Sequence, residues 1–240
     1  TRARYKKVIA KTHTAEEFVR ARGFDKCVTI PCGYDTARFR TPSVDERSNS
    51  RSSWRIDEDS KVLVYAGNLL PRRDVATAIR ALAKLRSRGE EAVFLIAGDG
   101  PELPKLRSLT RDLGIEESVH FLGQVNWEKL RQAFWAADIF VFPTHYEIFG
   151  MVLIEALACG LQIVSTPCPA AKDILSECPN AGRIVPVGDP LALAEACKTL
   201  FSRERSSPTS ENSTSGYLVR TNWNSISKRI IAEITTSEKI

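Results

Sequence analysis

The chain lacks several features that define whole classes of protein. It has a single methionine, Met151, and does not begin with one, and it has only three histidines in 240 residues. No apolar run approaches the ~18 residues that a membrane-spanning helix requires, and no segment has the pattern of a secretory signal. We therefore expect a processed chain or a piece of a longer protein, without a membrane span.

Metal-binding and disulfide patterns are also missing. The six cysteines form no Cys-x-x-Cys pair, and Cys159 and Cys197 fall in segments with helical periodicity. This usage is typical of buried, reduced thiols in a cytosolic protein rather than of a disulfide framework or a zinc site. His13 and His120 have no companions at ligand spacing. The sequence thus predicts no metal site.

The net charge of +5 is mild, and the basic residues are scattered except in the segment 2–7 at the start of the chain. No alternation of aromatic and basic residues suggests stacking on nucleic-acid bases, so we expect no nucleic-acid partner. The basic start is either a solvated face or a contact with anionic lipid headgroups. We therefore expect a cytoplasmic protein and leave peripheral membrane contact open.

Short apolar runs alternate with helix-length segments along most of the chain. The expected strands cover residues 62–66, 92–97, 118–122, 138–142, 162–166 and 183–187. The expected helices cover residues 74–87, 101–113, 126–136, 149–159, 170–176 and 190–202. Strands without polar alternation, separated by helices, are typical of a parallel sheet covered on both faces. We predict an α/β fold with a Rossmann-like, doubly wound parallel sheet.

Other segments lie outside this alternation. Residues 8–32 carry a further strand–helix–strand pattern. The stretch 41–60 is polar and rich in Ser and Arg, so we expect a surface loop or linker there. The stretch 202–216 has low complexity and is expected to be mobile. The Asp57-Glu-Asp59 triplet formally matches an Asp-x-Asp metal signature, but it precedes a strand, and we interpret it as a solvated charge run.

The helix expected at residues 149–159 is apolar on every side except at Glu155. A helix that is apolar all round is buried, and an ionised carboxylate is costly to bury unless it is hydrogen-bonded. Glu155 therefore needs a partner, and no cation lies within one turn of it. The simpler alternative is that Glu155 reaches solvent.

A second carboxylate, Glu147, lies in the loop before this helix, where the free amides of Phe149, Gly150 and Met151 favour an anion. Carboxylates that accept from hydroxyl groups, beside amides that hold phosphate, suit a sugar nucleotide. In open α/β sheets ligands bind at the carboxyl ends of strands, which is where this segment falls. The sequence therefore predicts a ligand site at this edge of the sheet.

The Glu147-x7-Glu155 spacing, with Phe149-Gly150 after the first glutamate, resembles the signature of the group-1 (family 4) retaining glycosyltransferases, which have the GT-B fold. Further segments similar to the family are Ile30–Phe39, Val62–Arg73, Phe94–Pro101, Val119–Gly123 and Asn222–Ser227. The resemblance runs from about Val8 to Ile234 and implies the C-terminal, donor-binding half of such an enzyme.

The resemblance also implies a domain organisation. Residues 1–40 would be the end of an N-terminal acceptor domain and the connection between domains. Residues 41–220 would be the nucleotide-sugar-binding domain, and residues 221–240 a closing helix that packs back toward the N-terminal domain. The acceptor would bind to the missing N-terminal domain, so we expect this chain alone to bind the donor without turning it over.

Roles for individual residues follow from the resemblance. Glu155 would accept hydrogen bonds from the donor ribose, and Glu147 would lie near the donor sugar and its reacting carbon. The family's phosphate loop carries Gly-Arg and, five residues on, Lys. The matching residues here are Asn68 and Arg73, so one cation is kept and one is lost. Arg73 with Glu147 would be catalytic, although two exposed arginines, Arg72 and Arg73, at a helix start are the simpler alternative.

The remaining expected contacts surround the donor. Gly67 and Asn68 would lie in the phosphate loop, and the Gly98–Gly100 turn and Leu122 would border the nucleotide. His145 would donate to a phosphate or a sugar hydroxyl, unless it is simply packed or solvated.

The function implied by the resemblance is metal-independent transfer of a hexose from a UDP- or GDP-sugar to a glycan or lipid-linked acceptor, with retention of configuration, as in polysaccharide biosynthesis. No cofactor is expected, because the donor is a substrate. Two alternatives remain open. Asn68 favours a nucleotide-sugar-binding module or an inactive homologue. The other alternative is a doubly wound domain of the receiver or flavodoxin type, but such a domain does not explain the segment with the two glutamates.

Overall fold

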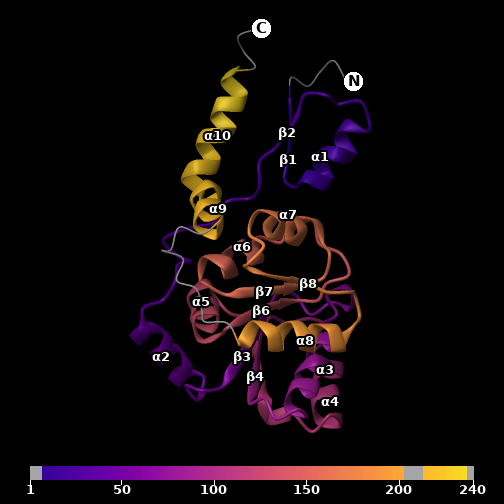
Figure 1. Ribbon diagram of the computed structural model, residues 1–240, viewed down its shortest axis with the longest axis vertical. Coiled ribbons are helices and arrows are strands. Elements are labelled where there is room, and N and C mark those ends of the chain that lie inside the picture. Colours follow the sequence, from indigo (N-terminus) through magenta and orange to yellow (C-terminus); the bar gives the residue numbers. More distant parts are fainter. Residues whose placement is uncertain (1–6, 203–212, 237–240) are drawn as a thin grey trace.

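A six-stranded parallel sheet forms the centre of the molecule (Figure 1). The computed structural model describes residues 7–202 and 213–236. The strands are β3 (Lys61–Ala66), β4 (Ala92–Ala97), β5 (Val119–Gly123), β6 (Ile139–Phe142), β7 (Gln162–Ser165) and β8 (Gly182–Ile184). Their order, β5-β4-β3-β6-β7-β8, reverses direction between β3 and β6. This is the doubly wound order, so the predicted fold class is confirmed.

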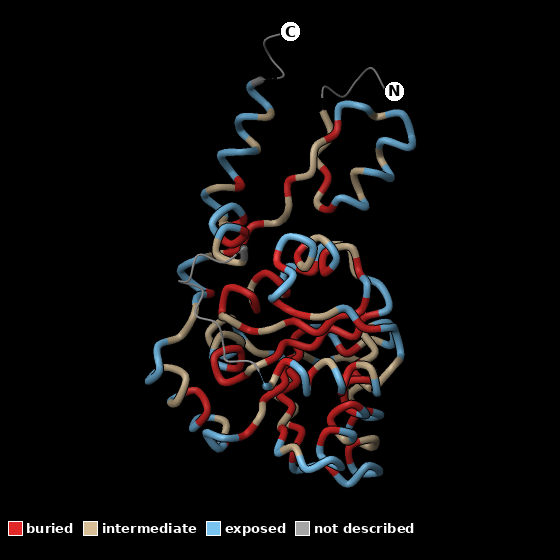
Figure 2. Tube along the Cα trace, viewed as in Figure 1, coloured by how far each residue is buried: buried red, intermediate tan, exposed pale blue. Residues whose placement is uncertain are grey.

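Helices cover the sheet and follow the predicted segments closely. They are α3 (Val75–Arg86), α4 (Leu103–Asp112), α5 (Trp127–Ala136), α6 (Met151–Ala158), α7 (Pro169–Glu177) and α8 (Pro190–Phe201), with short 3-10 turns at Pro71–Arg73 and Glu116–Ser118. Figure 2 shows that the buried residues concentrate in the strands and on the helix faces turned toward them. The apolar strands are thus buried on both faces, as expected for a parallel sheet.

A smaller unit lies beyond one end of the sheet domain (Figure 1). It contains β1 (Val8–Ala10), α1 (His13–Arg20) and β2 (Cys27–Thr29), with β1 and β2 paired in parallel. Beside it runs α10 (Trp223–Thr236), and α9 (Ser213–Thr221) lies at the adjoining end of the sheet domain, in contact with α7. The Arg229 guanidinium donates to the Thr29 carbonyl at 3.3 Å, and Lys7 pairs with Glu233. The C-terminal helix therefore packs on the N-terminal strands.

The segment before α2 (Val44–Ser53) and the junction of α9 with α10 lie side by side where the smaller unit meets the sheet domain. The Tyr34 amide donates to the Thr221 carbonyl at 3.1 Å, and the Trp223 amide donates to the Tyr34 carbonyl at 3.1 Å. A side chain at Gly33 would bring its Cβ within 2.8 Å of the Trp223 ring. Glycine fits here because the Trp223 ring packs directly against the chain at this residue.

The prediction of a loop at residues 41–60 is wrong. Residues Val44–Ser53 form α2, which begins with a capping box. The Glu46 amide donates to Ser43 Oγ at 3.2 Å, and the Ser43 amide donates to the Glu46 carboxylate at 2.9 Å. This pairing satisfies amides that a helix start leaves free. The Ser-x-x-Glu signal was present in the sequence, but the polar composition of the segment hid it.

Two arginines hold α2 against the sheet domain. Arg47 donates to the carbonyls of Trp135 and Ala137 at 2.9 Å and pairs with Asp138 at 2.6 Å. Arg51 is 1% exposed and donates to three carbonyls in the turn before β3. These bonds compensate the cost of burying a cation. Asp57 lies in that turn, before the start of β3, and contributes its carbonyl.

The second polar stretch, 202–216, is only partly described. Residues 203–212 lie outside the described residues, whereas residues 213–216 form the start of α9. Of the basic segment 2–7, only Lys7 is described. Among residues 7–202 and 213–236, no helix combines the length and apolar character needed to cross a bilayer. All six cysteines are free thiols, and five of them are buried.

Candidate active site

The loops that follow β3 and β6 meet at the point where the strand order reverses. The His145 amide donates to the Arg72 carbonyl at 2.8 Å, and the Thr144 hydroxyl donates to the same carbonyl at 3.2 Å. Ligands of doubly wound sheets bind in the crevice that such a reversal opens at the carboxyl ends of the strands. The predicted residues from both loops are therefore brought together at this crevice.

Arg73 and Glu147 form an ion pair across the crevice. Their side chains are 15% and 18% exposed, respectively. The Arg73 guanidinium lies over the Phe142 ring, 5.6 Å from its centroid. Its Nε is buried and has no hydrogen-bond partner. A buried guanidinium with an unsatisfied N–H is costly, so this cation is placed to receive a further acceptor.

The Glu147 carboxylate also closes the turn before α6. It accepts from the amide of Ile148 at 2.9 Å and from that of Phe149 at 3.3 Å. Burial alone would raise the pKa of Glu147, but the Arg73 ion pair and the two amides outweigh it and lower the pKa. The Phe149 amide, predicted to be free for a phosphate, therefore has a partner within the chain.

The start of α6 leaves other donors open. Gly150 caps the helix with φ +49°, a left-handed conformation that suits glycine. No side chain caps this end, and within the described part of the chain no acceptor is recorded for the amides of Met151 and Val152. Unpartnered amides at a helix start attract anions. The predicted anion site at Gly150 and Met151 thus remains available.

Glu155 lies in the middle of α6 and is partly buried. Burial raises the pKa of Glu155, and the charge of Arg38 partly counteracts that rise. No described residue is recorded as donating a hydrogen bond to its carboxylate, so its oxygens are free to accept from a ligand. Arg38 belongs to the segment before α2, and no sequence pattern linked it to Glu155.

The glycines after β3 and β4 hold two loops together. A Cβ at Gly98 would lie 1.9 Å from the Gly67 carbonyl oxygen, and one at Gly100 would lie 2.5 Å from that of Leu69. Both residues also have positive φ. The amides of Gly67 and Gly98 donate to the carbonyls of their neighbouring strands. These glycines therefore shape the border of the crevice, and their amides are already satisfied.

Asn68 is exposed at the tip of the loop after β3. The hydroxyl of Tyr65, a fully buried residue, donates to the Asn68 carbonyl at 3.0 Å and so holds the loop against the end of β3. Burial raises the pKa of Tyr65, while the charges of Arg73 and Arg72 oppose the rise. Tyr65 is a supporting residue that the sequence did not reveal. Leu122 is partly buried near the end of β5.

His145 has a specific partner within the chain. Its Nε2 lies 3.1 Å from Asp74 Oδ2, and the same carboxylate oxygen accepts from the Thr77 hydroxyl at 2.7 Å. Asp74 has φ +46°, which is unusual for a residue other than glycine. The His145 side chain is 52% exposed, as the solvated alternative expects, and its contact with Asp74 connects the loop after β6 to the start of α3. Arg72 is exposed beside it.

Arg73, Glu147 and the open start of α6 lie together after the ends of β3 and β6, and Glu155 lies one helical turn further along α6. A guanidinium and helix amides bind phosphate oxygens, and an unpartnered carboxylate accepts from hydroxyl groups. Among the described residues, no group of three or more His, Cys, Asp or Glu side chains could hold a metal ion. The arrangement therefore suits an anionic ligand that also carries hydroxyl groups.

Comparison with known proteins identifies the family. The model of the family described as "Glycosyl transferases group 1" matches residues 46–215, which is more than half of the chain. The GDP-mannose-dependent alpha-(1-6)-phosphatidylinositol monomannoside mannosyltransferase of Mycolicibacterium smegmatis is 32% identical over 183 residues, covering 73% of this chain and 47% of that protein. The D-inositol 3-phosphate glycosyltransferase of Geodermatophilus obscurus is 31% identical over 187 residues, covering 74% of this chain and 41% of that protein. The chain thus spans less than half the length of these relatives.

Solved structures show the same fold. Anabaena Alr3699/HepE in complex with UDP and glucose superposes with a TM-score of 0.82 at 22% identity, over 96% of this chain and 63% of that chain. Sucrose-phosphate synthase of Thermosynechococcus elongatus superposes with a TM-score of 0.75 at 24% identity, over 95% of this chain and 57% of that chain. The sheet has the fold of the C-terminal, Rossmann-like domain of GT-B proteins. The chain belongs to the group 1 glycosyl transferases.

Proposed function

We propose that the chain is the donor-binding half of a glycosyltransferase that moves a hexose from a nucleoside-diphosphate sugar to a glycan or lipid-linked acceptor. Transfer would retain the configuration of the sugar and would need neither a metal ion nor a cofactor. The observation that carries the proposal is the buried Arg73 guanidinium, with its unsatisfied Nε, facing Glu147. The structures of Anabaena Alr3699/HepE with UDP and glucose and with UDP-glucose support this type of donor.

In this proposal the oxygens of the diphosphate take the place of the Glu147 carboxylate at the Arg73 guanidinium. Arg73 would bind the phosphate oxygens together with the Met151 amide, and Glu155 would accept from the ribose hydroxyls. Charge grows on the diphosphate as the bond to the sugar breaks, and donors already in place stabilise that charge. Glu147 would then face the reacting carbon and support its positive charge. The acceptor would bind to a preceding domain.

The test is calorimetric titration of the chain with UDP and with GDP, each with and without EDTA. We expect saturable binding of at least one nucleotide that EDTA leaves unchanged. Absolute dependence on added Mg²⁺ would contradict the metal-free mechanism, and absence of binding to both nucleotides would contradict the donor site itself.

A second candidate is a nucleotide-sugar-binding module or an inactive homologue. It is favoured by Asn68, which stands where the family carries an arginine. Hydrolysis of the donor by the full-length protein distinguishes the two candidates. Slow release of free hexose would support the enzyme, whereas tight donor binding without any turnover would support the binding module.

A further inference from the structure

Two of the three histidines in the chain pair with an aspartate, and one of these pairs lies beside the crevice. The Nε2 atom of His145 lies 3.1 Å from Asp74 Oδ2. Asp74 directly follows Arg73 in the chain, and His145 lies two residues before Glu147, so the pair joins the same two loops as the ion pair across the crevice. The His145–Asp74 pair therefore lies next to the proposed donor site.

The backbone of Asp74 has a conformation that suits glycine. Its φ of +46° and ψ of +43° lie in the left-handed region, and among the described non-glycine residues only Arg55 shares a positive φ. An aspartate before a helix usually accepts from the first amides of that helix, but Asp74 makes no such bond. Its Oδ2 instead accepts from the Thr77 hydroxyl at 2.7 Å and faces His145. Glycine would suit the backbone but would not supply this carboxylate.

The pairing decides what the imidazole ring of His145 can offer to a ligand. A carboxylate only accepts, so a hydrogen bond to Asp74 requires a proton on Nε2. The other ring nitrogen, Nδ1, then has a lone pair in the neutral ring and an N–H in the positively charged ring. The side chain is half-exposed, and no described residue is recorded as a partner of Nδ1. The ring therefore offers a second donor only when it is protonated.

The other charged groups around the pair have partners of their own. They are Arg72 and Arg73 of the 3-10 turn, Glu147 of the loop after β6, and Glu102, which borders the same small pocket as Asp74. Glu147 pairs with Arg73, and Glu102 pairs with Lys105 at 2.9 Å. Arg72 is exposed, and its guanidinium donates to the Tyr146 carbonyl at 3.5 Å. Among the described residues, Asp74 is thus the only recorded partner of the His145 ring.

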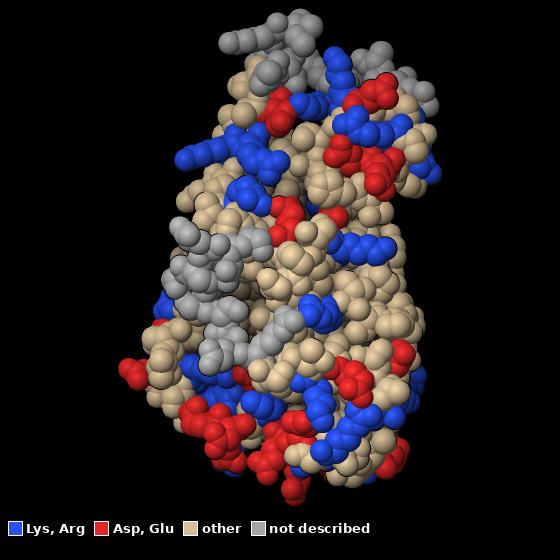
Figure 3. All heavy atoms as spheres, in the orientation of Figure 1, with Lys and Arg blue, Asp and Glu red and all other residues tan. Residues whose placement is uncertain are grey.

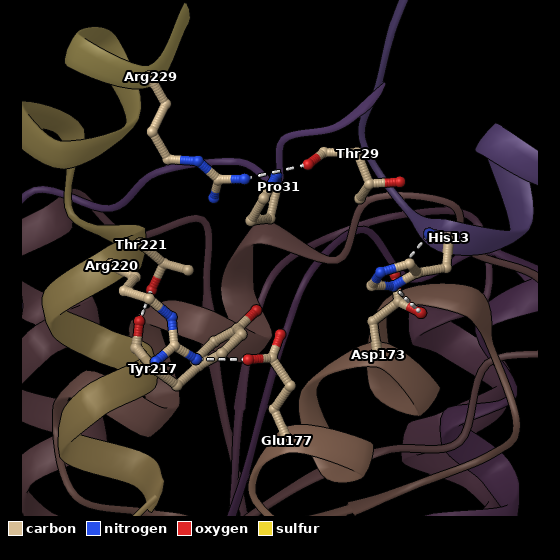
Figure 4. A pocket seen from close by; sticks show the side chains of 9 residues that line it. All are labelled: His13, Thr29, Pro31, Asp173, Glu177, Tyr217, Arg220, Thr221 and Arg229. Carbon is tan, nitrogen blue, oxygen red and sulfur yellow. Dashed lines mark hydrogen bonds and ion pairs between the residues drawn. The ribbon is translucent and has the colours of Figure 1, made fainter. Parts of the chain in front are cut away.

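The two remaining histidines lie elsewhere in the fold. His13 pairs with Asp173 at 3.3 Å and lines a cavity between the smaller unit and the sheet domain (Figure 4). His120 lies on β5, where burial lowers its pKa, so it gains its charge at a lower pH than an exposed histidine. On the face shown in Figure 3, acidic and basic side chains are mixed over both parts of the molecule, so no field of one sign dominates that face. His145 is therefore the histidine placed to give the crevice a charge that changes with pH.

We propose that Asp74 is a positioning residue that directs Nδ1 of His145 toward the diphosphate of the donor, so that donor binding takes up a proton near neutral pH. The inference rests on the proposed function, which puts the diphosphate at Arg73. The proton comes from solvent and stays on the imidazole while the donor is bound. Nδ1 then donates to a phosphate oxygen, in a crevice that lacks the arginine carried by the family at the position of Asn68.

The test is calorimetric titration of the chain with UDP-glucose and with GDP-mannose at a series of pH values from slightly acidic to slightly basic. In both ligands the diphosphate is esterified at each end and does not titrate in this range, unlike that of UDP. We expect the affinity to fall about tenfold as the pH rises, because the protonated ring and its charge-assisted hydrogen bond are lost. Protonation of Glu155 acts in the opposite direction, since it would weaken binding as the pH falls.

Proton uptake is measured directly by repeating the titration at neutral pH in buffers with different ionisation enthalpies. We expect a net uptake of protons by the complex. Binding that is insensitive to pH and takes up no proton would overturn this inference and leave the proposed function intact. No binding of either nucleotide sugar at any pH would overturn both.

Two variants and two controls assign the effect to the pair. His145→Gln should abolish the proton uptake and weaken binding about tenfold at slightly acidic pH. Asp74→Gly should do the same while folding normally, which urea unfolding checks, because glycine suits this backbone. His13→Gln removes the other histidine that pairs with an aspartate, and Arg80→Gln removes an exposed cation on α3, so both should change nothing. Proton uptake that persists in His145→Gln or Asp74→Gly, or that disappears in His13→Gln, would contradict the assignment.

Discussion

The Arg73 guanidinium and the Glu147 carboxylate form an ion pair across the point where the strand order of the sheet reverses. One residue follows β3 and the other follows β6, and β3 and β6 are adjacent strands. The same carboxylate accepts from the amides of Ile148 and Phe149. Under the proposed function, Glu147 pairs with the positive groups that a diphosphate would use, so ligand binding would compete with this ion pair.

This competition predicts opposite effects for the two partners. Arg73→Gln should weaken UDP binding at least tenfold, because a charge-assisted hydrogen bond contributes ~1.5–3 kcal/mol. Glu147→Gln should tighten UDP binding about fivefold, since a partly exposed charge pair contributes up to ~1 kcal/mol. Calorimetry with UDP measures both, and Arg80→Gln serves as the control. A loss of affinity in Glu147→Gln would show that the carboxylate supports the nucleotide rather than competing with it.

Glu155 should make ribose recognition dependent on pH. Glu155→Gln should weaken UDP binding by ~1.5–3 kcal/mol, the range for hydrogen bonds to a charged group. Because burial raises the pKa of Glu155, the parent should lose its ribose contact as the pH falls through that raised value, earlier than an exposed glutamate would. Comparison of UDP with its 2′,3′-dideoxy analogue isolates the effect, since both share the phosphate titration. If pH and the Glu155→Gln substitution change the affinities for UDP and for the dideoxy analogue equally, Glu155 does not contact the ribose.

Asn68→Arg should restore the cation that the family carries in this loop. Affinity should rise for UDP, less for UMP, and not for uridine, which has no phosphate. The gain should shrink with salt, because exposed charges are screened over about 10 Å at 0.1 M. Titrations of all three ligands at two salt concentrations measure it. Equal changes for the three ligands, or none, would mean that the loop does not face the phosphates.

The capping box of α2 should stabilise the fold in a pH-dependent way. Hydrogen bonds from Arg40 and Ser43 lower the pKa of Glu46 from 4.5 to about 2. A lowered pKa gives stability that is present above pH 4.5 and lost as the pH falls toward 2. Glu46→Gln should therefore cost about 1 kcal/mol near neutral pH, a typical value for a helix cap, and progressively less as the pH falls from 4.5 through about 2. Urea unfolding across this range measures the difference.

Asp45→Asn provides the control for this prediction. It removes an exposed charge from the same helix turn, and Asp45 has no recorded partner among the described residues. Two results would show that the loss does not come from the capping contact: an equal loss in Asp45→Asn, or a loss in Glu46→Gln that does not shrink as the pH falls toward 2.

Local sequence determined most elements of the fold. The strand predicted at 92–97 is β4, Ala92–Ala97, and that at 62–66 is one residue short of β3, Lys61–Ala66. Apolar runs and helical periodicity are properties of neighbouring residues, so they can be recognised in one short segment. The same is true of the spacing between Glu147 and Glu155, which puts one carboxylate before α6 and the other within it. Helix α2 escaped prediction because its polar composition hid the capping signal and because Arg47 holds it through the carbonyls of Trp135 and Ala137, far along the chain.

Only the tertiary structure decided which of these groups meet. The sequence indicated that Arg73 and Glu147 lie at strand ends, but their ion pair depends on β3 and β6 being neighbours. Strand order is set by how whole helices and strands pack, and no short segment contains that information. For the same reason the charge that acts on Glu155 comes from Arg38, far away in the chain, although the sequence could show that a partner was needed.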